Sequence, residues 1–111
     1  MSTVSFTDAG TWGGRPVVRR LADAAPRHRV VVTGTIDDAA TSGAGALGPT
    51  GSFRCELDDG TGRIGLLFLG RPHVPGLAVG VRCTVEGTAR PDRDGLVLWN
   101  PLYRLEPPGD R

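Results

Sequence analysis

Two histidines, His28 and His73, are the side chains in this sequence best suited to acid–base chemistry. Neither stands in a context that supplies a nucleophile, a base and a residue to orient them, so no catalytic triad is predicted. The pair Asp58 and Asp59 is better explained by a turn, because Asp hydrogen-bonds its own backbone there and a hard cation needs more oxygen ligands. We therefore expect no enzymatic activity and no metal site.

Two glycine patterns match the dinucleotide-binding fingerprint G-x-G-x-x-G, one at Gly43, Gly45 and Gly48 and one at Gly60, Gly62 and Gly65. The fingerprint holds a pyrophosphate only where a strand precedes it and a helix follows it. Pro49 follows the first match, and the second runs into a predicted strand. We therefore expect no cofactor.

Two cysteines, Cys55 and Cys83, lie 28 positions apart, with no Cys or His close to either in the sequence. A four-ligand metal site cannot be assembled from them. We interpret both as reduced, buried side chains that act as small hydrophobic residues.

The length of 111 residues fits one domain with its own core. The 17 Gly and 9 Pro, with 5% aromatic residues, favour many turns and short strands. All 13 basic residues are Arg, and the formal net charge is only +1. The strongly basic surface typical of nucleic-acid-binding proteins is therefore missing.

The first 25 residues contain no apolar run long enough for a signal peptide or a membrane span, which predicts a cytoplasmic protein without a membrane partner. Residues 1–14 are small and polar, and we expect them to be mobile. Between positions 15 and 25, apolar residues recur at helical spacing: Val17, Val18, Leu21 and Ala22. This spacing predicts one short amphipathic helix that ends before Pro26.

After Pro26 the pattern changes to β-branched runs and alternation of apolar with polar residues, which predicts five strands. They span 29–36, 52–57, 63–69, 81–89 and 96–105, the last with a break at Pro101. The connections are a long flexible loop at 38–51, a hairpin turn at 58–62, a connector at 70–80 and a polar turn at 90–95.

This order predicts an all-β fold: a five-stranded Greek-key OB-fold barrel with a short N-terminal helix. A small sandwich or an SH3-like barrel is the structural alternative. The barrel occupies residues 27–107, between a flexible N-terminal segment at 1–26 and a tail at 108–111. Because the core-facing alternation begins at Arg29, we expect the barrel alone to be the stable unit.

Two segments carry a resemblance to known proteins. The run at 30–36, followed by 53–57 and the turn at 59–62, resembles the OB domains of the tRNA-anticodon-binding type, which occur in class II aminoacyl-tRNA synthetases. The segment at 99–103 resembles the last strand of the wedge domain of the RecG helicase. The whole is similar to small stand-alone actinobacterial OB-fold proteins that bind nucleic acid, which implies single-stranded DNA or RNA as the ligand.

The sequence departs from the synthetase domains at two outward positions. Arg54 stands where they carry an aromatic residue that stacks on a base, and Gly65 stands where they carry a polar residue. Anticodon reading is therefore not expected, although a guanidinium plane can also stack on a base.

The predicted binding surface is the outer face of the second and third strands with its flanking loops. Its residues are Arg29, Arg54, Arg63, Arg71, His73, Arg90, Arg93 and Trp99. Alternation leaves open which face Trp99 occupies. The leading hypothesis is a non-enzymatic module that binds single strands weakly. The alternative is an OB domain that binds a protein partner as an accessory subunit, through its neutral barrel, its N-terminal helix and the loop at 38–51. Any single arginine is explained equally well as a solvated side chain paired with a neighbouring acid.

Overall fold

The computed structural model describes residues 6–42, 51–71, 73–93 and 95–107. The fold is all-β, with a single short 3-10 turn, η1 (Leu21–Asp23), among the described residues. The strands are β1 (Thr11–Trp12), β2 (Arg15–Pro16), β3 (Arg29–Ser42), β4 (Ser52–Asp58), β5 (Arg63–Leu69), β6 (Arg82–Asp92), β7 (Gly95–Trp99) and β8 (Leu102–Leu105). No helix in this described part is both long and apolar enough to cross a membrane.

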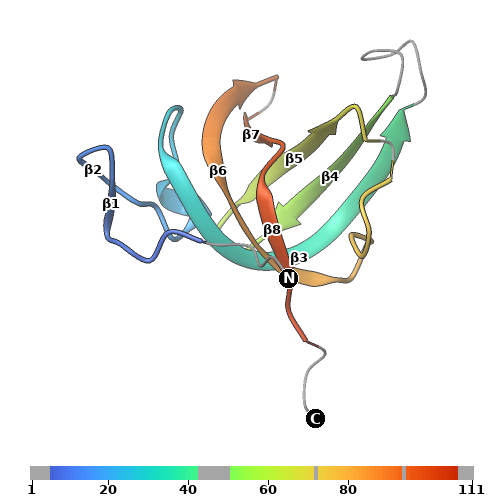
Figure 1. Cartoon of the computed structure of the whole chain (residues 1–111), viewed down its shortest axis with the longest axis horizontal. Coiled ribbons are helices and arrows are strands. Elements are labelled where there is room, and N and C mark those ends of the chain that lie inside the picture. The colour runs from blue at the N-terminus through green and yellow to red at the C-terminus, as the bar shows by residue number, and fades with distance from the viewer. Residues whose placement is uncertain (1–5, 43–50, 72, 94, 108–111) are drawn as a thin grey trace, which may run out of the picture.

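Five of these strands form a closed ring, in which β3 pairs with β4, β4 with β5, β5 with β7, β7 with β6, and β6 again with β3 (Figure 1). The β5–β7 pair is parallel and the other four pairs are antiparallel. Strand β8 adds to β6 outside the ring, and the β1–β2 hairpin stands to one side of it (Figure 1).

Strand β3 closes the ring because it pairs with two strands in succession. Its first half, from Arg29 to Thr35, pairs with β6, and its second half pairs with β4 up to Ser42. The register shifts between Ile36 and Asp38, which marks a bulge where the strand changes partner.

The predicted strand positions are largely confirmed, and two connections differ. The predicted loop is wrong for residues 38–42, because pairing with β4 keeps this small polar stretch extended. The remainder of that loop, 43–50, lies outside the described residues. Strand β6 runs to Asp92 instead of 89, since its last residues pair with β7. The turn at 58–62 is confirmed, with the Asp59 carboxylate accepting the N–H groups of Thr61 and Gly62.

The inner side chains of the ring form one core. It includes Val30, Val32, Ile36, Phe53, Cys55, Leu57, Ile64, Leu66, Phe68, Cys83, Val85 and Leu98. Both cysteines are free and buried, as predicted. Burial raises the pKa of Cys55 to about 12 and that of Cys83 to about 11, so both stay as neutral thiols.

The predicted N-terminal helix is wrong, because this segment packs in extended form. Val18 makes a parallel bridge to Val30: its N–H donates to the carbonyl of Arg29, and its own carbonyl accepts the N–H of Val31. Val18 and Leu21 are both buried in the core. Val18 is extended and Leu21 begins a 3-10 turn, and this combination produces the three-residue spacing that resembles a helix. The core therefore begins at Val18 and not at Arg29.

The closure of the ring requires a glycine at position 34. A Cβ there would lie 2.5 Å from the backbone oxygen of Asp58, which is too close for any side chain. We expect Gly34→Ala to lower the free energy of unfolding by about 1–3 kcal/mol, because backbone must shift to admit the methyl group. Urea unfolding of both proteins measures the difference.

The matched control is Gly95→Ala, since a Cβ at Gly95 meets nothing within 4 Å and this residue also lies in a strand. If G34A unfolds at the same urea concentration as G95A, the close approach to Asp58 is not a constraint on the fold.

Candidate nucleic-acid interface

The outward side chains of β4, β5 and β7 lie in register across the sheet. Arg54 stands opposite Leu67, and Leu67 stands opposite Trp99. Successive strands are about 4.8 Å apart, so this row extends for about 10 Å. Trp99 therefore shares its face with Arg54, which answers the question that alternation left open.

Trp99 and Arg90 form a stacked pair on this face. The Arg90 guanidinium carbon lies 3.9 Å from the centroid of the Trp99 ring, within cation–π distance. The Trp99 residue is 47% exposed, whereas its neighbour Leu98 is fully buried. Within the described part of the chain, Arg90 forms no ion pair, so its charge is not neutralised.

Asn100 holds Trp99 in place at the end of β7. Its backbone adopts φ 47°, a left-handed conformation that Asn tolerates better than most residues. Its N–H donates to the carbonyl of Leu67 at 2.7 Å, and its side-chain oxygen accepts the N–H of Leu69 at 2.9 Å. The end of β7 is thereby fixed to β5.

A groove of about 330 Å³, here the Arg90 groove, lies beside this stacked pair. Its walls are formed by Arg29, Glu86, Gly87, Thr88, Arg90, Trp99, Asn100 and Leu102. Thr88, Asn100 and Leu102 were not among the predicted binding residues. Asn100 and Leu102 lie in the segment 99–103, but its resemblance to a known strand does not show which of its side chains line a groove, and Thr88 belongs to no motif. The groove offers the guanidinium group of Arg90 and the indole ring of Trp99 to a ligand, whereas the Arg29 guanidinium is paired with Glu86.

A second groove of about 380 Å³, here the Arg54 groove, lies over β4 and β5 and is more nearly neutral. The Arg54 guanidinium donates to Asp92 at 2.6 Å and to Glu56 at 3.2 Å. It lies over Gly65, where a Cβ would come 2.6 Å from its Nη2 atom. Gly65 thus leaves the space that this guanidinium fills.

The ion pairs of Arg54 change the proton affinities of both partners. Burial lowers the pKa of Arg54, but the hydrogen bonds and charges of Asp92 and Glu56 outweigh it and raise this pKa overall. The hydrogen bond from Arg54, with that from the Arg93 backbone, lowers the pKa of Asp92. Arg63 on the same groove pairs with Asp37 at 2.9 Å.

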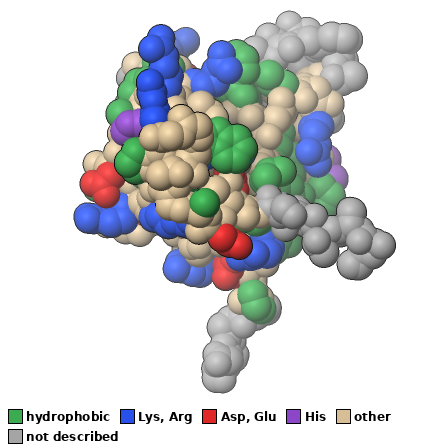
Figure 2. All heavy atoms as spheres, turned by 60° about the vertical axis from the view of Figure 1, so that its left-hand side comes forward, with side chains coloured by type: hydrophobic (Ala, Val, Ile, Leu, Met, Phe, Trp, Pro, Cys, Tyr) green, Lys and Arg blue, Asp and Glu red, His purple; other side chains and the backbone are tan. Residues whose placement is uncertain are grey.

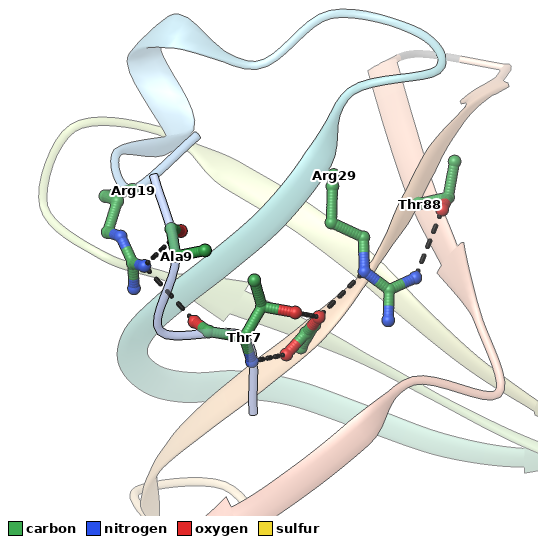
Figure 3. A network of polar contacts seen from close by, with 6 residues as sticks. Thr7, Ala9, Arg19, Arg29 and Thr88 are labelled. Atoms are coloured by element: carbon green, nitrogen blue, oxygen red, sulfur yellow. Dashed lines mark hydrogen bonds and ion pairs between the residues drawn. The ribbon is translucent and has the colours of Figure 1, made fainter. Parts of the chain in front are cut away.

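Arg29 lies on a different part of the surface from Arg54. It begins β3, and its side chain extends toward Thr88 on β6 (Figure 3). Its Nε donates to Glu86 at 2.8 Å and its Nη1 to Thr88 at 3.2 Å, while its guanidinium lies 4.5 Å from the Trp12 ring centroid. Arg29 reaches the predicted site only as a wall of the Arg90 groove.

Glu86 is a buried carboxylate, only 1% exposed, on the outer side of β6. It accepts hydrogen bonds from the N–H and the hydroxyl group of Thr7 and from Arg29 (Figure 3). Burial alone would raise its pKa, but these donors and the charge of Arg29 lower it overall. Glu86 therefore holds the N-terminal segment and Arg29 against the ring.

The remaining predicted residues are peripheral. Arg71 and His73 are exposed in the connector after β5, and Arg71 lies 5.7 Å from the ring centroid of Phe68. Arg93 is exposed after β6. Of the described residues that form the two grooves, none is Arg71, His73 or Arg93. The structure brings Arg29, Arg90 and Trp99 together at one groove, and Arg54 and Arg63 at the other.

The surface charge is mixed. On the face in Figure 2, arginine side chains form several separate groups with acidic side chains between them. In the described ranges, no three His, Cys, Asp or Glu side chains gather closely enough to hold a metal ion.

Comparison with protein-family models and with curated proteins finds no match for this chain.

Replacing Glu86 by Gln removes the charge and keeps the shape. We expect E86Q to lower the free energy of unfolding at neutral pH by about 1–3 kcal/mol, because a buried charged acceptor forms strong hydrogen bonds. The folded-state pKa is lowered, so the charge stabilises fully above the unfolded value of about 4.3, and this stability is lost as the pH falls through the folded value. Urea unfolding at a series of pH values should show the two proteins converging in acid.

Asp23→Asn is the control, because Asp23 is exposed in η1 and its loss should change little at any pH. A stability gap between wild type and E86Q that stays constant from neutral to acid pH would contradict this role of the charge.

Proposed function

We propose that the ring is an OB fold, a five-stranded Greek-key barrel, and that it binds single-stranded DNA or RNA weakly and without catalysis. The order of strand pairing supports this fold. The connector at 70–80 takes the chain from β5 to β6, which lies beside β3, and β7 then returns to lie parallel to β5. Such crossing between neighbours that are not consecutive is characteristic of a Greek key.

The observation that carries the binding proposal is the exposed Arg90–Trp99 pair. Proteins that bind single strands without sequence preference combine aromatic rings, on which bases stack, with positive charges that contact phosphates. Trp99 supplies a ring and Arg90 a positive charge without an ion-pair partner among the described residues. The Arg90 groove beside them has room for part of a nucleotide.

The ion pairs on the rest of the surface set the strength of binding. Arg29, Arg54 and Arg63 each have a carboxylate partner. Few arginines on such a surface are free to neutralise phosphates and release the counterions of the nucleic acid, so affinity should be micromolar or weaker, on the order of 10⁻⁶ M or above, with a shallow salt dependence.

We expect Trp99→Leu to weaken binding to a single-stranded oligonucleotide by about 1–3 kcal/mol, or roughly 5- to 150-fold, because a stacked base loses its platform. Fluorescence anisotropy with labelled DNA and RNA oligomers at two salt concentrations measures the affinity. Arg90→Gln should weaken binding in the same direction.

Trp12→Leu is a matched control, because Trp12 is 51% exposed and also lies under an arginine, Arg29. Trp12 lies outside both grooves. If W99L binds as tightly as W12L, or if the wild type binds no single strand at low salt, the proposal fails.

Asp92→Asn should strengthen binding, because it frees Arg54 from its shorter ion pair. We expect the slope of log affinity against log salt to steepen by about 0.7, the value for one more phosphate contact on a single strand. The same anisotropy titration measures this slope.

Asp23→Asn adds the same charge away from both grooves and is the control. Equal effects of D92N and D23N would show that net charge alone matters, and that Arg54 does not contact the ligand.

A protein partner is the second candidate. Strand β8 pairs on one edge only within the described sheet, and its Leu102 and Leu105 are exposed. A free edge with apolar side chains can accept a strand from a partner. Absence of nucleic-acid binding in the titration above would favour this alternative.

A further inference from the structure

A third cavity, of about 510 Å³, lies between the N-terminal segment and the outer side of β3. It shares no residue with the Arg90 groove or the Arg54 groove. Six separate segments contribute to it: residues 6–8, residues 19–20, strand β3, the turn after β4, and the strands β6 and β8 with one residue each. Its volume is in the range of sites that bind small ligands.

Three arginines from two segments line this N-terminal cavity: Arg19, Arg20 and Arg104. Arg19 is held by the carbonyl groups of Thr7 and Ala9, at 3.2 and 3.3 Å, which fix its position and leave its charge in place (Figure 3). Arg20 forms no ion pair within the described chain. Arg104 lies 5.1 Å from the Phe6 ring centroid.

The acidic groups of the cavity only partly offset these charges. Asp59 accepts hydrogen bonds from the N–H groups of Leu21, Thr61 and Gly62. Both of its oxygens are therefore already occupied by donors from the protein. Asp8 is exposed. Arg104 has only a loose contact with Glu106, at 3.8 Å. The free hydrogen-bonding capacity of the walls is thus mainly that of guanidinium donors, which suits an anion.

A chain of hydroxyl groups forms another wall and offers an acceptor. Thr84 donates its hydroxyl hydrogen to Glu106 at 2.8 Å, so in the 2.6 Å contact between Thr33 and Thr84 the donor must be Thr33. The Thr33 oxygen keeps a lone pair and can accept a hydrogen bond from a ligand. A ligand that fits both walls carries an anionic group and a hydroxyl group.

We propose that the N-terminal cavity binds a small phosphorylated ligand with free hydroxyl groups, the chemistry shared by mononucleotides and sugar phosphates. Its phosphate contacts Arg20 and Arg104, because guanidinium groups match phosphate oxygens in geometry and charge. A ligand hydroxyl group donates to Thr33. This site is independent of single-strand binding at Trp99.

Two-dimensional NMR of the ¹⁵N-labelled full chain tests the proposal, with AMP, ribose 5-phosphate and inorganic phosphate as separate probes. We expect AMP or ribose 5-phosphate to shift the amide signals of Arg20, Thr33 and Thr61 in a saturable way, with a dissociation constant on the order of 1 mM or below. Inorganic phosphate should bind more weakly than both. Equal affinity for the two organic probes identifies a sugar phosphate site, and tighter binding of AMP identifies a nucleotide site.

Arg20→Gln and Arg104→Gln should each weaken this binding about tenfold or more, because each removes a charged hydrogen bond to phosphate. Arg15→Gln, which removes an exposed arginine from β2 outside the cavity, should leave it unchanged. The spectra of the variants themselves report whether the fold is intact.

Three results would overturn the proposal. The first is the absence of shifts at the three amides at about ten times the expected dissociation constant. The second is binding by R20Q and R104Q equal to that of the wild type, or binding that is lost only in R90Q, which would place the ligand in the Arg90 groove. The third is inorganic phosphate binding as tightly as ribose 5-phosphate, which would rule out a role for the hydroxyl groups. Trp99 does not line the N-terminal cavity, so W99L should still bind the small phosphorylated probes. The proposal for the N-terminal cavity and the proposal for single-strand binding can therefore fail independently of each other.

Discussion

The whole ring depends on one strand that must satisfy two neighbours. Strand β3 pairs with β6 through its first half and with β4 through its second half. To change partner it bends at the bulge near Asp37, and at Gly34 its backbone passes so close to Asp58 that no side chain fits. Closure in turn places the outward residues of β4, β5 and β7 in one row, and this row brings Arg54 and Trp99 to the same face.

Three of the six arginines predicted for this surface, Arg29, Arg54 and Arg63, form ion pairs within the fold. Arg29 is tied to Glu86, and Arg54 links β4 to the end of β6 through Asp92. Such pairs hold strands and segments together, and each also removes a positive charge that a phosphate would need. Arg90 differs because its partner is an aromatic ring, which leaves its charge available. A surface with nearly equal numbers of acids and arginines can therefore still present a local cationic site.

The strands were predictable because buried faces impose a period of two, as in Phe53, Cys55 and Leu57. The N-terminal helix was not, because Val18 and Leu21 reach the same core through different backbone conformations that mimic helical spacing. The candidate residues were predictable as a set of arginines, but their grouping was not. The Arg54–Asp92 pair joins positions 38 residues apart, and only the register of the strands brings them together.

The hydrogen bonds between Thr7 and Glu86 join residues that are 79 positions apart. Strand β3 likewise gains its second partner only when β6 has been made, although the residues of β3 are made much earlier. During synthesis on a ribosome, the first third of the chain therefore emerges with most of its partners still unmade. Contacts over such long sequence separations slow folding, and an unpaired β3 presents open edges in the meantime. The N-terminal segment leaves the ribosome before β6 does, so Thr7 can reach its place on Glu86 only after most of this chain has been made.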